Sequence, residues 1–582
     1  MTLPKIPLAQ TVVQLCKLKG IKHIVISPGS RNAPLTIGFS NHPFFSCYSI
    51  IDERSAAFFA LGIAQQLNEP VAVVCTSGSA LLNYYPAIAE AYYSNIPLLV
   101  LSADRPKYLI NIGDGQTINQ RNVFANHILY SANLKENLDT EMINDEDEPK
   151  IIKNIENKLE TFLELQKDIQ QQNEIEINKA INEAINNRGP VHINVPFSEP
   201  LYELIEGFTI SPKLIKSECN SPKIEDVSDY QDIWRKAKRK MVLVGVKVPN
   251  TIDQKYLDIL ANDLSVVVFT ETTSNIHHDN FFPSIDKIIA PLRDSEFKAL
   301  QPEILITFGG LIVSKKIKAF LRKYQPEHHW HVGEKKANDT FFCLDKHFKF
   351  DVNTFFDQFL EKKDKIDSDY QSYWSSVKQN RNKKHNQYLE NSPYSDFKVF
   401  DTVLKQIPDD YLLHLGNSST VRYAQLFNLN KSLKVFCNRG TSGIDGSTST
   451  AIGASIVANN PTLLISGDLS FFYDSNALWN DYIPNSFRII VINNGGGGIF
   501  RILPGHKNTE NFDTFFETKH NLRAEHLCEM YGLEYCFSNS ENELSKTLKP
   551  FFEESDKPKL LEIFTPRLLN DEILLNYFSF IK

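Results

Sequence analysis

Short runs of β-branched and other apolar residues recur along this chain, and each ends in Gly, Ser, Asp, Arg or Pro before a segment with helical spacing. The first 200 residues contain five such runs, "IKHIVISPGSR", "FSCYSIIDERS", "PVAVVCTSGS", "IPLLVLSADRP" and "GPVHINVPF". Helical patterns such as "RSAAFFALGIAQQL" lie between them. Strands that alternate with helices predict parallel α/β architecture, because neighbouring parallel strands need a crossover connection.

The same alternation returns in two later blocks. The second block contains "RKMVLVGVKVP", "LSVVVFTETTS", "EILITFGGLIVSKK" and "HHWHVGEK", and the third contains "YLLHLGNSS", "KVFCNRG", "PTLLISGDLS", "FRIIVINNGG" and "KPKLLEIFTP". A chain of 582 residues is too long for a single hydrophobic core. The sequence therefore predicts an α/β protein with three doubly wound parallel-sheet domains, at residues 1–202, 225–360 and 395–582.

An acidic stretch rich in Lys, Gln and Asn interrupts the first block at residues 134–180. Its second half has helical spacing, which favours a solvated pair of helices over a disordered tail.

Charge and composition limit the partners of the chain. A net charge of −8 argues against general nucleic-acid binding, so a local cluster of Arg and Lys must hold any anionic ligand. No apolar run is long enough to span a membrane, and the first residues, "MTLPKIPLAQTVVQL", lack the apolar core of a secretory signal. Eight scattered cysteines without metal-ligand spacing are typical of a reducing compartment. We therefore expect a cytoplasmic protein without a membrane span.

Two polar strand ends in the third block suggest a metal site. Gly467 and Asp468 follow one strand, and Asn494 follows the next, directly before a run of four glycines. Carboxylate, amide and carbonyl oxygens are ligands that Mg²⁺ prefers, usually shared with phosphates. Free N–H groups from Gly467 to Ser470, at a helix start, suit a diphosphate. Each motif alone is better explained as a structural loop, but the pair at this spacing favours a metal–diphosphate site.

Other patterns give weaker signals. His277, His278 and the histidines of "HHWH" (328–331) have no carboxylate or cysteine spacing to support a transition metal, so we expect exposed or packing residues. The glycine run is not a GxGxxG motif after a first strand, which argues against a Rossmann nucleotide site.

The paired motif resembles that of the thiamine-diphosphate enzymes, GDG followed by NN, although Leu469 replaces the last glycine of GDG. Within that superfamily the chain resembles the 2-succinyl-5-enolpyruvyl-6-hydroxy-3-cyclohexene-1-carboxylate (SEPHCHC) synthases of menaquinone biosynthesis. The stretches that carry this resemblance are "SPGSR" (27–31), "DERSAAF" (52–58), "TSGSALLNYYPA" (76–87), "SADRP" (102–106), "GQTINQ" (115–120), "GNSSTVR" (416–422), "NRGTSGIDGSTSTA" (438–451) and "GDLSFFYDSNAL" (467–478). The resemblance is thin in the second block.

The resemblance implies a role for each matching residue. Glu53 would be the catalytic acid that activates thiamine diphosphate by bonding to its aminopyrimidine ring. Asp468, Asn494 and the carbonyl of Gly496 would hold Mg²⁺, for which Mn²⁺ can substitute. The other cofactor-binding residues would be Ser418, Ile444, Gly467, Leu469, Ser470, Ile499 and Phe500. The substrate pocket would consist of Ser30, Arg31, Arg105, Gln116, Lys315, Lys316, Ser418, Arg422 and Arg439, with Ile499, Phe500 and Leu503 as its apolar wall.

The implied substrates, 2-oxoglutarate and isochorismate, each carry two carboxylates, which Arg side chains grip well. Each residue also has a structural explanation. An arginine can pair with a neighbouring acid, Lys315 and Lys316 can be a solvated helix start, and Glu53 can complement a helix dipole. Gly115 and Asn119 depart from the family pattern, where asparagine and arginine stand.

The resemblance also implies a homodimer or homotetramer, because the family assembles its site across a subunit interface. Two alternatives stay open. The chain can be another thiamine-diphosphate 2-oxoacid decarboxylase or an acetolactate-type synthase, which the need for flavin or for a second, anionic acceptor would distinguish. It can also be a non-catalytic relative that binds the cofactor. Retention of Glu53, Asp468 and Asn494 together argues against that second alternative.

Overall fold

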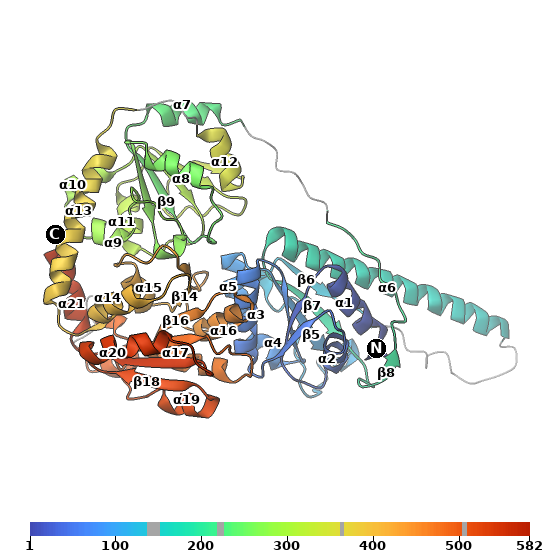
Figure 1. Ribbon diagram of the computed structural model, residues 1–582. Helices are drawn as coiled ribbons and strands as arrows, with labels where there is room; N and C mark the ends of the chain where they lie inside the picture. The colour runs from blue at the N-terminus through green and yellow to red at the C-terminus, as the bar shows by residue number, and fades with distance from the viewer. Residues whose placement is uncertain (137–151, 218–225, 361–365, 503–508) are drawn as a thin grey trace. The chain divides into compact units, whose positions relative to one another are not determined.

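The computed structural model describes residues 1–136, 152–217, 226–360, 366–502 and 509–582 (Figure 1). In these residues the chain forms three parallel sheets and one two-stranded antiparallel pair. Strands alternate with α-helices along most of each parallel sheet, as the sequence predicts, except between β5 (Leu98–Asp104) and β6 (Tyr130–Asn133) and between β12 (His328–Val332) and β13 (Lys346–Phe348). The predicted fold class is confirmed. None of the described helices has the length and apolar content needed to cross a membrane.

The first and third sheets share one strand order. The first sheet runs β3 (Ser46–Ser49), β2 (His23–Ile26), β4 (Val71–Cys75), β5 (Leu98–Asp104), β7 (Val191–Pro196) and β6 (Tyr130–Asn133). The third runs β15 (Lys434–Phe436), β14 (Leu412–Leu415), β16 (Thr462–Gly467), β17 (Arg488–Asn493), β19 (Lys559–Phe564) and β18 (Glu534–Ser538). In each sheet the direction of the strand order reverses beside the strand that comes first in the sequence, β2 or β14. Loops that follow the strands at such a switch point diverge, and ligands bind there.

The middle sheet is apolar on both faces. It runs β10 (Val266–Thr270), β9 (Lys240–Val244), β11 (Ile304–Phe308), β12 (His328–Val332) and β13 (Lys346–Phe348). Alternate residues of β9 belong to two separate hydrophobic clusters, Val242 and Val244 to one and Met241 and Leu243 to the other. A sheet buried on both faces is the expected environment for near-continuous apolar strands.

Helices cover these sheets. The principal helices of the first part are α1 (Pro7–Leu18), α2 (Ala33–Ser40), α3 (Glu53–Leu67), α4 (Ser79–Asn83), α5 (Tyr85–Ser94) and α6 (Ile152–Asn187). Those around the middle sheet are α7 (Ser228–Lys236), α8 (Gln254–Ala261), α9 (Ile285–Ile289), α10 (Asp294–Leu300), α11 (Lys315–Lys323), α12 (Val352–Phe359) and α13 (Tyr370–Asn391). The third part has α14 (Asp396–Gln406), α15 (Ser419–Ala424), α16 (Ser447–Val457), α17 (Asp468–Tyr473), α18 (Ile499–Ile502), α19 (Glu525–Tyr531), α20 (Glu541–Phe552) and α21 (Asn570–Phe580).

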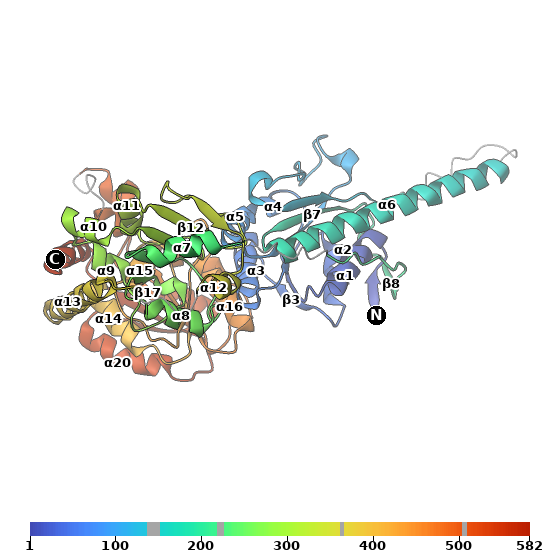
Figure 2. The same ribbon diagram turned by 90° about the horizontal axis from the view of Figure 1, so that it is seen from above.

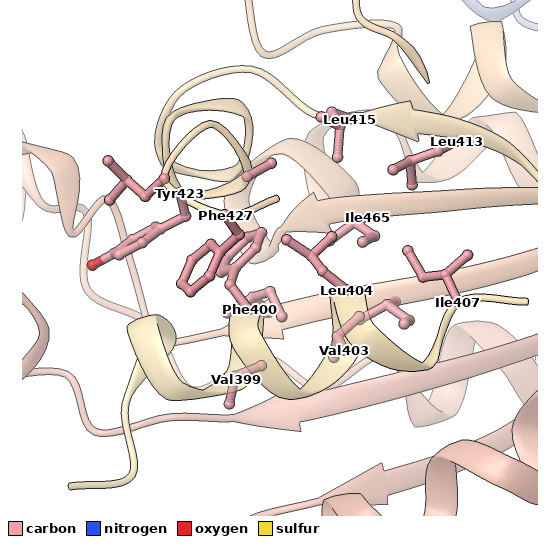
Figure 3. Close-up of a cluster of buried hydrophobic side chains, with 14 of the residues drawn as sticks. Val399, Phe400, Val403, Leu404, Ile407, Leu413, Leu415, Tyr423, Phe427 and Ile465 are labelled. Atoms are coloured by element: carbon pink, nitrogen blue, oxygen red, sulfur yellow. The ribbon is translucent and has the colours of Figure 1, made fainter. Parts of the chain in front are cut away.

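The core of the third part forms between α14 and the strands at its switch point. Figure 3 shows Phe400 and Leu404 of α14 pointing toward Leu413 and Leu415 of β14 and Ile465 of β16. All five side chains are buried. The apolar spacing of α14 thus fixes its first residue, Asp396, close to the loops that follow these strands.

The acidic insertion differs from the predicted pair of helices. The structure has one continuous helix, α6 (Ile152–Asn187), and residues 137–151 lie outside the described part. Buried residues of α6, among them Ile177, Ala180 and Ile181, join the core of the first sheet. Figure 2 shows α6 extending beyond the portion that packs there. The helix is continuous because its sequence contains neither Gly nor Pro, and the apolar residues near its C-terminal end pack into the core.

The chain divides into two compact units. The first comprises Met1–Cys219 together with Thr448–Asn459 and Asp474–Pro484, and the second comprises the rest. Within the first unit α3 and α16 lie side by side (Figure 1). A Cβ atom on Gly62 would lie 2.0 Å from the carbonyl oxygen of Thr450, and one on Gly453 would lie 2.0 Å from that of Phe59. The two helix backbones therefore touch through glycine on both sides.

Replacing Gly62 by alanine should destabilise the first unit by about 3 kcal/mol, because only a shift of one helix backbone relieves the clash. Thermal unfolding followed by circular dichroism measures the loss. Gly115→Ala is the matched control, since no atom lies within 4 Å of a Cβ there. Equal unfolding temperatures for Gly62→Ala and the wild type would contradict the helix contact.

Candidate active site

Asp468 joins the two polar strand ends of the third sheet. It follows β16, begins α17 and is only 3% exposed. Its Oδ2 atom accepts hydrogen bonds from the N–H groups of Gly495 and Gly496, at 2.9 and 3.0 Å. Its Oδ1 atom accepts one from the N–H of Leu469 at 2.7 Å. The structure thus brings the GD motif into direct contact with the glycines that follow the NN motif.

Asn494 has a fixed orientation. Its Nδ2 atom donates to Oδ2 of Asp396 at 3.0 Å, while its Oδ1 atom is buried and has no hydrogen-bond partner among the described residues. Asp396 is itself buried, and its Oδ1 accepts from the hydroxyl of Thr565 at 2.5 Å. Burial raises the pKa of Asp396 to about 6, and the Asp468 carboxylate adds to the rise. Because an ionised carboxylate only accepts, the amide nitrogen must face Asp396 and the amide oxygen is left over.

The glycine run is required by backbone contacts. Gly495 and Gly496 have φ angles of +77° and +149°, in the left-handed region that favours glycine. A Cβ on Gly496 would lie 2.7 Å from the carbonyl oxygen of Glu517. The N–H of His520 donates to the carbonyl of Gly495 at 3.1 Å, and His520 Nε2 lies 3.3 Å from Oδ2 of Asp468. The segment around residues 517–520 therefore lies directly on the glycines.

A buried ionic cluster holds this segment. Glu517 is completely buried, and its carboxylate accepts from Arg501 Nε at 2.5 Å and also pairs with Arg567. Both arginines also contact Asp513, at 3.3 and 3.4 Å. A buried carboxylate between two guanidinium groups is satisfied only while the segment keeps this position.

The donor set fits a magnesium ion bound to a diphosphate. It comprises one carboxylate (Asp468), one buried amide oxygen without a partner (Asn494) and a glycine carbonyl, which are hard oxygen ligands. A Cβ on Gly467 would meet no atom within 4 Å, so open space lies beside the backbone there. Among the described residues no group of three or more His, Cys, Asp or Glu side chains could hold a metal ion, and the predicted set is not of that kind.

The loop that carries Ile444 is tied to the ends of two strands. Asn417, which follows β14, donates through Nδ2 to the carbonyls of Asn438 and Gly443 at 2.6 and 2.7 Å. The hydroxyl of Ser470 donates to the carbonyl of Ile444 at 2.7 Å. Ile444 is 36% exposed, an uncommon state for a residue whose backbone is so well fixed.

The predicted cations of the second unit lie on separate elements. Arg439 is buried, donates to Asn417 Oδ1 at 2.7 Å, and its Nε atom has no hydrogen-bond partner in the described residues. Arg422 of α15 donates to the carbonyl of Ser418 at 2.5 Å. Burial lowers the pKa of Arg422, and the nearby charge of Arg439 lowers it further. Lys315 and Lys316 are the first two residues of α11.

Two of the three predicted wall residues lie in α18. Ile499 is the first residue of this helix and Phe500 the second. Phe500 is 36% exposed, and the centre of its ring lies 6.3 Å from that of Phe516. Leu503 lies outside the described residues.

In the first unit Glu53 begins α3. The preceding Asp52 caps the helix by accepting from the N–H of Ser55 at 3.1 Å. Burial raises the pKa of the Cys75 thiol, and the Glu53 carboxylate adds to this rise. Glu53 is partly exposed. Its effect on Cys75, the last residue of β4, places it close to the carboxyl end of that strand.

The remaining predicted residues of the first unit also follow strand ends. Arg31, beyond β2, is buried, donates to the carbonyl of Phe197 at 2.9 Å and pairs with Glu199 at 3.0 Å. Ser30, beside it, is exposed.

Arg105 follows β5, donates to the carbonyl of Gly115 at 3.1 Å and lies 3.7 Å from Asp114. Gln116 is exposed, and its carbonyl lies 3.1 Å from the place of a Cβ on Gly78, beyond β4. The side chain of Asn119 accepts from the N–H of Arg121 at 3.2 Å. The two predicted site arginines of this unit, Arg31 and Arg105, thus have acidic partners within the chain.

The structure adds residues that the sequence does not indicate. Asp396 looks like an ordinary acidic residue in the first turn of a helix, since Ser395 caps α14. Asn417 is embedded in the matching stretch "GNSSTVR" but had no stated role. His520 and Glu517 contact the site from a segment without any periodic pattern, so only coordinates reveal them.

Comparison with known proteins identifies the family. Three family models match the chain: "Thiamine pyrophosphate enzyme, N-terminal TPP binding domain" over residues 6–128, "Middle domain of thiamine pyrophosphate" over 211–415, and "Thiamine pyrophosphate enzyme, C-terminal TPP binding domain" over 416–563. Thiamine pyrophosphate is another name for thiamine diphosphate. The first model covers β2 to β5 of the first sheet, and the last covers β15 to β18 and nearly all of β19 of the third.

Individual relatives carry one name. The 2-succinyl-5-enolpyruvyl-6-hydroxy-3-cyclohexene-1-carboxylate synthase of Christiangramia forsetii is 57% identical over 99% of both chains. The synthase of the same name from Flavobacterium psychrophilum is 54% identical over the full length of both, and that of Porphyromonas gingivalis is 38% identical over 98% of this chain and 96% of its own. The chain therefore belongs to the thiamine pyrophosphate enzymes and, within them, to the family of SEPHCHC synthases.

Proposed function

We propose that the protein decarboxylates 2-oxoglutarate and adds the resulting four-carbon unit to isochorismate, releasing CO₂ and forming SEPHCHC for menaquinone biosynthesis. The observation that carries the proposal is the unpartnered, buried Oδ1 of Asn494 beside Asp468, in a chain of this family. Bound thiamine diphosphate supplies the electron sink that loss of CO₂ from a 2-oxoacid requires.

Different residues of the chain would bind the metal ion and orient the cofactor. Asp468, Asn494 and the Gly496 carbonyl would hold Mg²⁺, with Asp396 keeping the amide oxygen of Asn494 turned toward the ion. Glu53 would bond to the pyrimidine ring and hold a proton there.

The cations would bind the substrate carboxylates. Arg439 fits this role best, because its buried Nε is a donor that has no acceptor among the described residues. Ser30, Arg31, Arg105, Gln116, Lys315, Lys316, Ser418 and Arg422 complete the proposed pocket. Arg31 and Arg105 would have to exchange or share their acidic partners when substrate binds.

The proposal extends to the organisation of the enzyme. We assign residues 1–202 to pyrimidine binding, 225–360 to a central domain and 395–582 to diphosphate binding, which the ranges of the three sheets and of the family models support. We also propose a homodimer or homotetramer in the cytoplasm. The cysteines of the described residues are free thiols, in keeping with a reducing compartment.

The test is consumption of isochorismate by purified protein with Mg²⁺, thiamine diphosphate and 2-oxoglutarate, omitting one component at a time. We expect loss of isochorismate only in the complete mixture, and none when pyruvate replaces 2-oxoglutarate. Release of CO₂ without loss of isochorismate would identify a simple decarboxylase. Cofactor binding without any turnover would favour a non-catalytic relative.

A further inference from the structure

A buried carboxylate of the middle sheet is bonded to the start of the helix that carries Lys315 and Lys316. Glu271 follows β10 and is 4% exposed. Its Oε2 accepts from the N–H of Val313 and its Oε1 from the N–H of Ser314, both at 2.7 Å. Both carboxylate oxygens are therefore committed to the two residues that precede α11.

The helix start is fixed from a second side. Ser314 caps α11, because its hydroxyl oxygen accepts from the N–H of Ile317 at 3.1 Å, and the same hydroxyl donates to Oδ1 of Asp286 in α9. Lys315 and Lys316 come directly after this anchored residue. Their backbone positions thus depend on two acids of the middle domain.

Glu271 also lies near two cations, Arg439 of the proposed pocket and Lys318 of α11. Its pKa is raised to about 7 by burial, against which the two backbone N–H groups and the charge of Arg439 act. Burial lowers the pKa of Lys318, one turn beyond Lys315, and the Glu271 charge opposes that effect. The carboxylate therefore lies within electrostatic reach of a cation on α11 and of one on the loop after β15.

A carboxylate suits this double anchor, because its two oxygens accept from two N–H groups whereas an amide offers only one acceptor oxygen. A neutral oxygen can accept from a helix-start N–H, and burying a carboxylate is expensive unless nearby positive charge compensates for it. The charge of Arg439 offsets part of this cost, and the pKa of Glu271 remains raised by burial.

We propose that Glu271 is a positioning residue for substrate binding, which holds the first turn of α11 so that Lys315 and Lys316 receive a substrate carboxylate. The inference rests on the proposed function, since it deepens the role of the same pocket. It gives the middle domain, where the family resemblance is thinnest, a direct part in recognising a dicarboxylate.

The experiment compares Glu271→Gln with Glu303→Gln in full-length protein. Glu303 is the matched control, because it directly precedes β11 of the same sheet and its carboxylate also accepts from a backbone N–H. Its Oε2 accepts from the N–H of Lys238 at 3.0 Å. The first readout is amide hydrogen exchange of the peptide that contains Val313 and Ser314. The second is KM and kcat for both substrates, with thiamine-diphosphate affinity measured separately.

We expect Glu271→Gln to speed exchange of that peptide by about 10-fold and to raise KM for at least one substrate by about 10-fold, with kcat and cofactor affinity nearly unchanged. Glu303→Gln should alter neither. Unchanged exchange would overturn the proposal, and so would faster exchange with an unchanged KM. If the wild type consumes no isochorismate, the proposed function fails, and binding of 2-oxoglutarate measured by calorimetry in both proteins then decides whether Glu271 positions the cations.

Discussion

Glu53→Gln should reduce turnover by about 10²–10⁴-fold while the protein still binds thiamine diphosphate, because the amide keeps the shape of the side chain but does not hold a proton as a carboxyl does. The measurements are kcat in the isochorismate assay and cofactor affinity by fluorescence titration. Glu53 begins α3 and is partly accessible, so the substitution leaves the helix intact.

Asp52→Asn is the control for that experiment. Asp52 caps the same helix and accepts from Asn476 at 2.7 Å. Asparagine can still cap the helix but offers only one acceptor oxygen, so the substitution should reduce stability by about 1 kcal/mol with a much smaller effect on turnover. If Glu53→Gln instead abolishes cofactor binding, Glu53 has a structural role and complements the helix dipole, as the sequence alone also allows.

Asp468→Asn should weaken Mg²⁺-dependent binding of thiamine diphosphate by about 100-fold, since it removes the one negative charge of the proposed ligand set. The amide still offers an oxygen to the N–H groups of Gly495 and Gly496. Calorimetric titration of the cofactor at several Mg²⁺ concentrations measures the loss.

Two further variants grade this result. Asp396→Asn should cost about 10-fold in Mg²⁺ affinity, because Asn494 is then free to turn its amide. Asp474→Asn, at a buried carboxylate that accepts from the N–H of Ser449 at 2.7 Å, should reduce stability and leave the Mg²⁺ dependence unchanged. Equal losses for Asp468 and Asp474 would show that the metal effect is general destabilisation.

Mixing the two inactive proteins is a control common to both predictions. If a site combines Glu53 of one subunit with Asp468 of another, a mixed dimer of Glu53→Gln and Asp468→Asn has one fully intact site, and an equimolar mixture recovers about a quarter of wild-type activity. No recovery after subunit exchange would place both residues of each site in one subunit.

The sequence predicts the interior strands of the parallel sheets well, but it misses one edge strand of each sheet. Interior strands such as β4, β9 and β16 have almost continuous apolar runs because both faces are covered. At one edge of each parallel sheet lies a strand that the sequence patterns do not predict, β6, β13 or β18, and each is partly exposed. The patterns also miss the short antiparallel pair β1 (Thr2–Pro4) and β8 (Leu204–Glu206). Partial exposure removes the apolar pattern on which the prediction depends.

The candidate site shows the same division. Asp468 and Asn494 can be predicted as site residues because each follows an apolar strand, and the carboxyl ends of parallel strands lie at the same edge of the sheet. Asp396 precedes Asn494 by 98 residues and Glu271 precedes Val313 by 42, with no local pattern to relate the partners. Such contacts arise from packing of helices and strands, which a single sequence does not encode at fixed spacing.

The composition of the first compact unit has a consequence for biosynthesis. That unit includes Thr448–Asn459 and Asp474–Pro484, so it cannot be completed when its first 219 residues leave the ribosome. At about 5–20 residues per second, translation from position 219 to Pro484 takes roughly 10–50 s. Until then the face of α3 around Gly62 lacks its partner helix, and the nascent chain exposes an apolar surface for which a chaperone can compete.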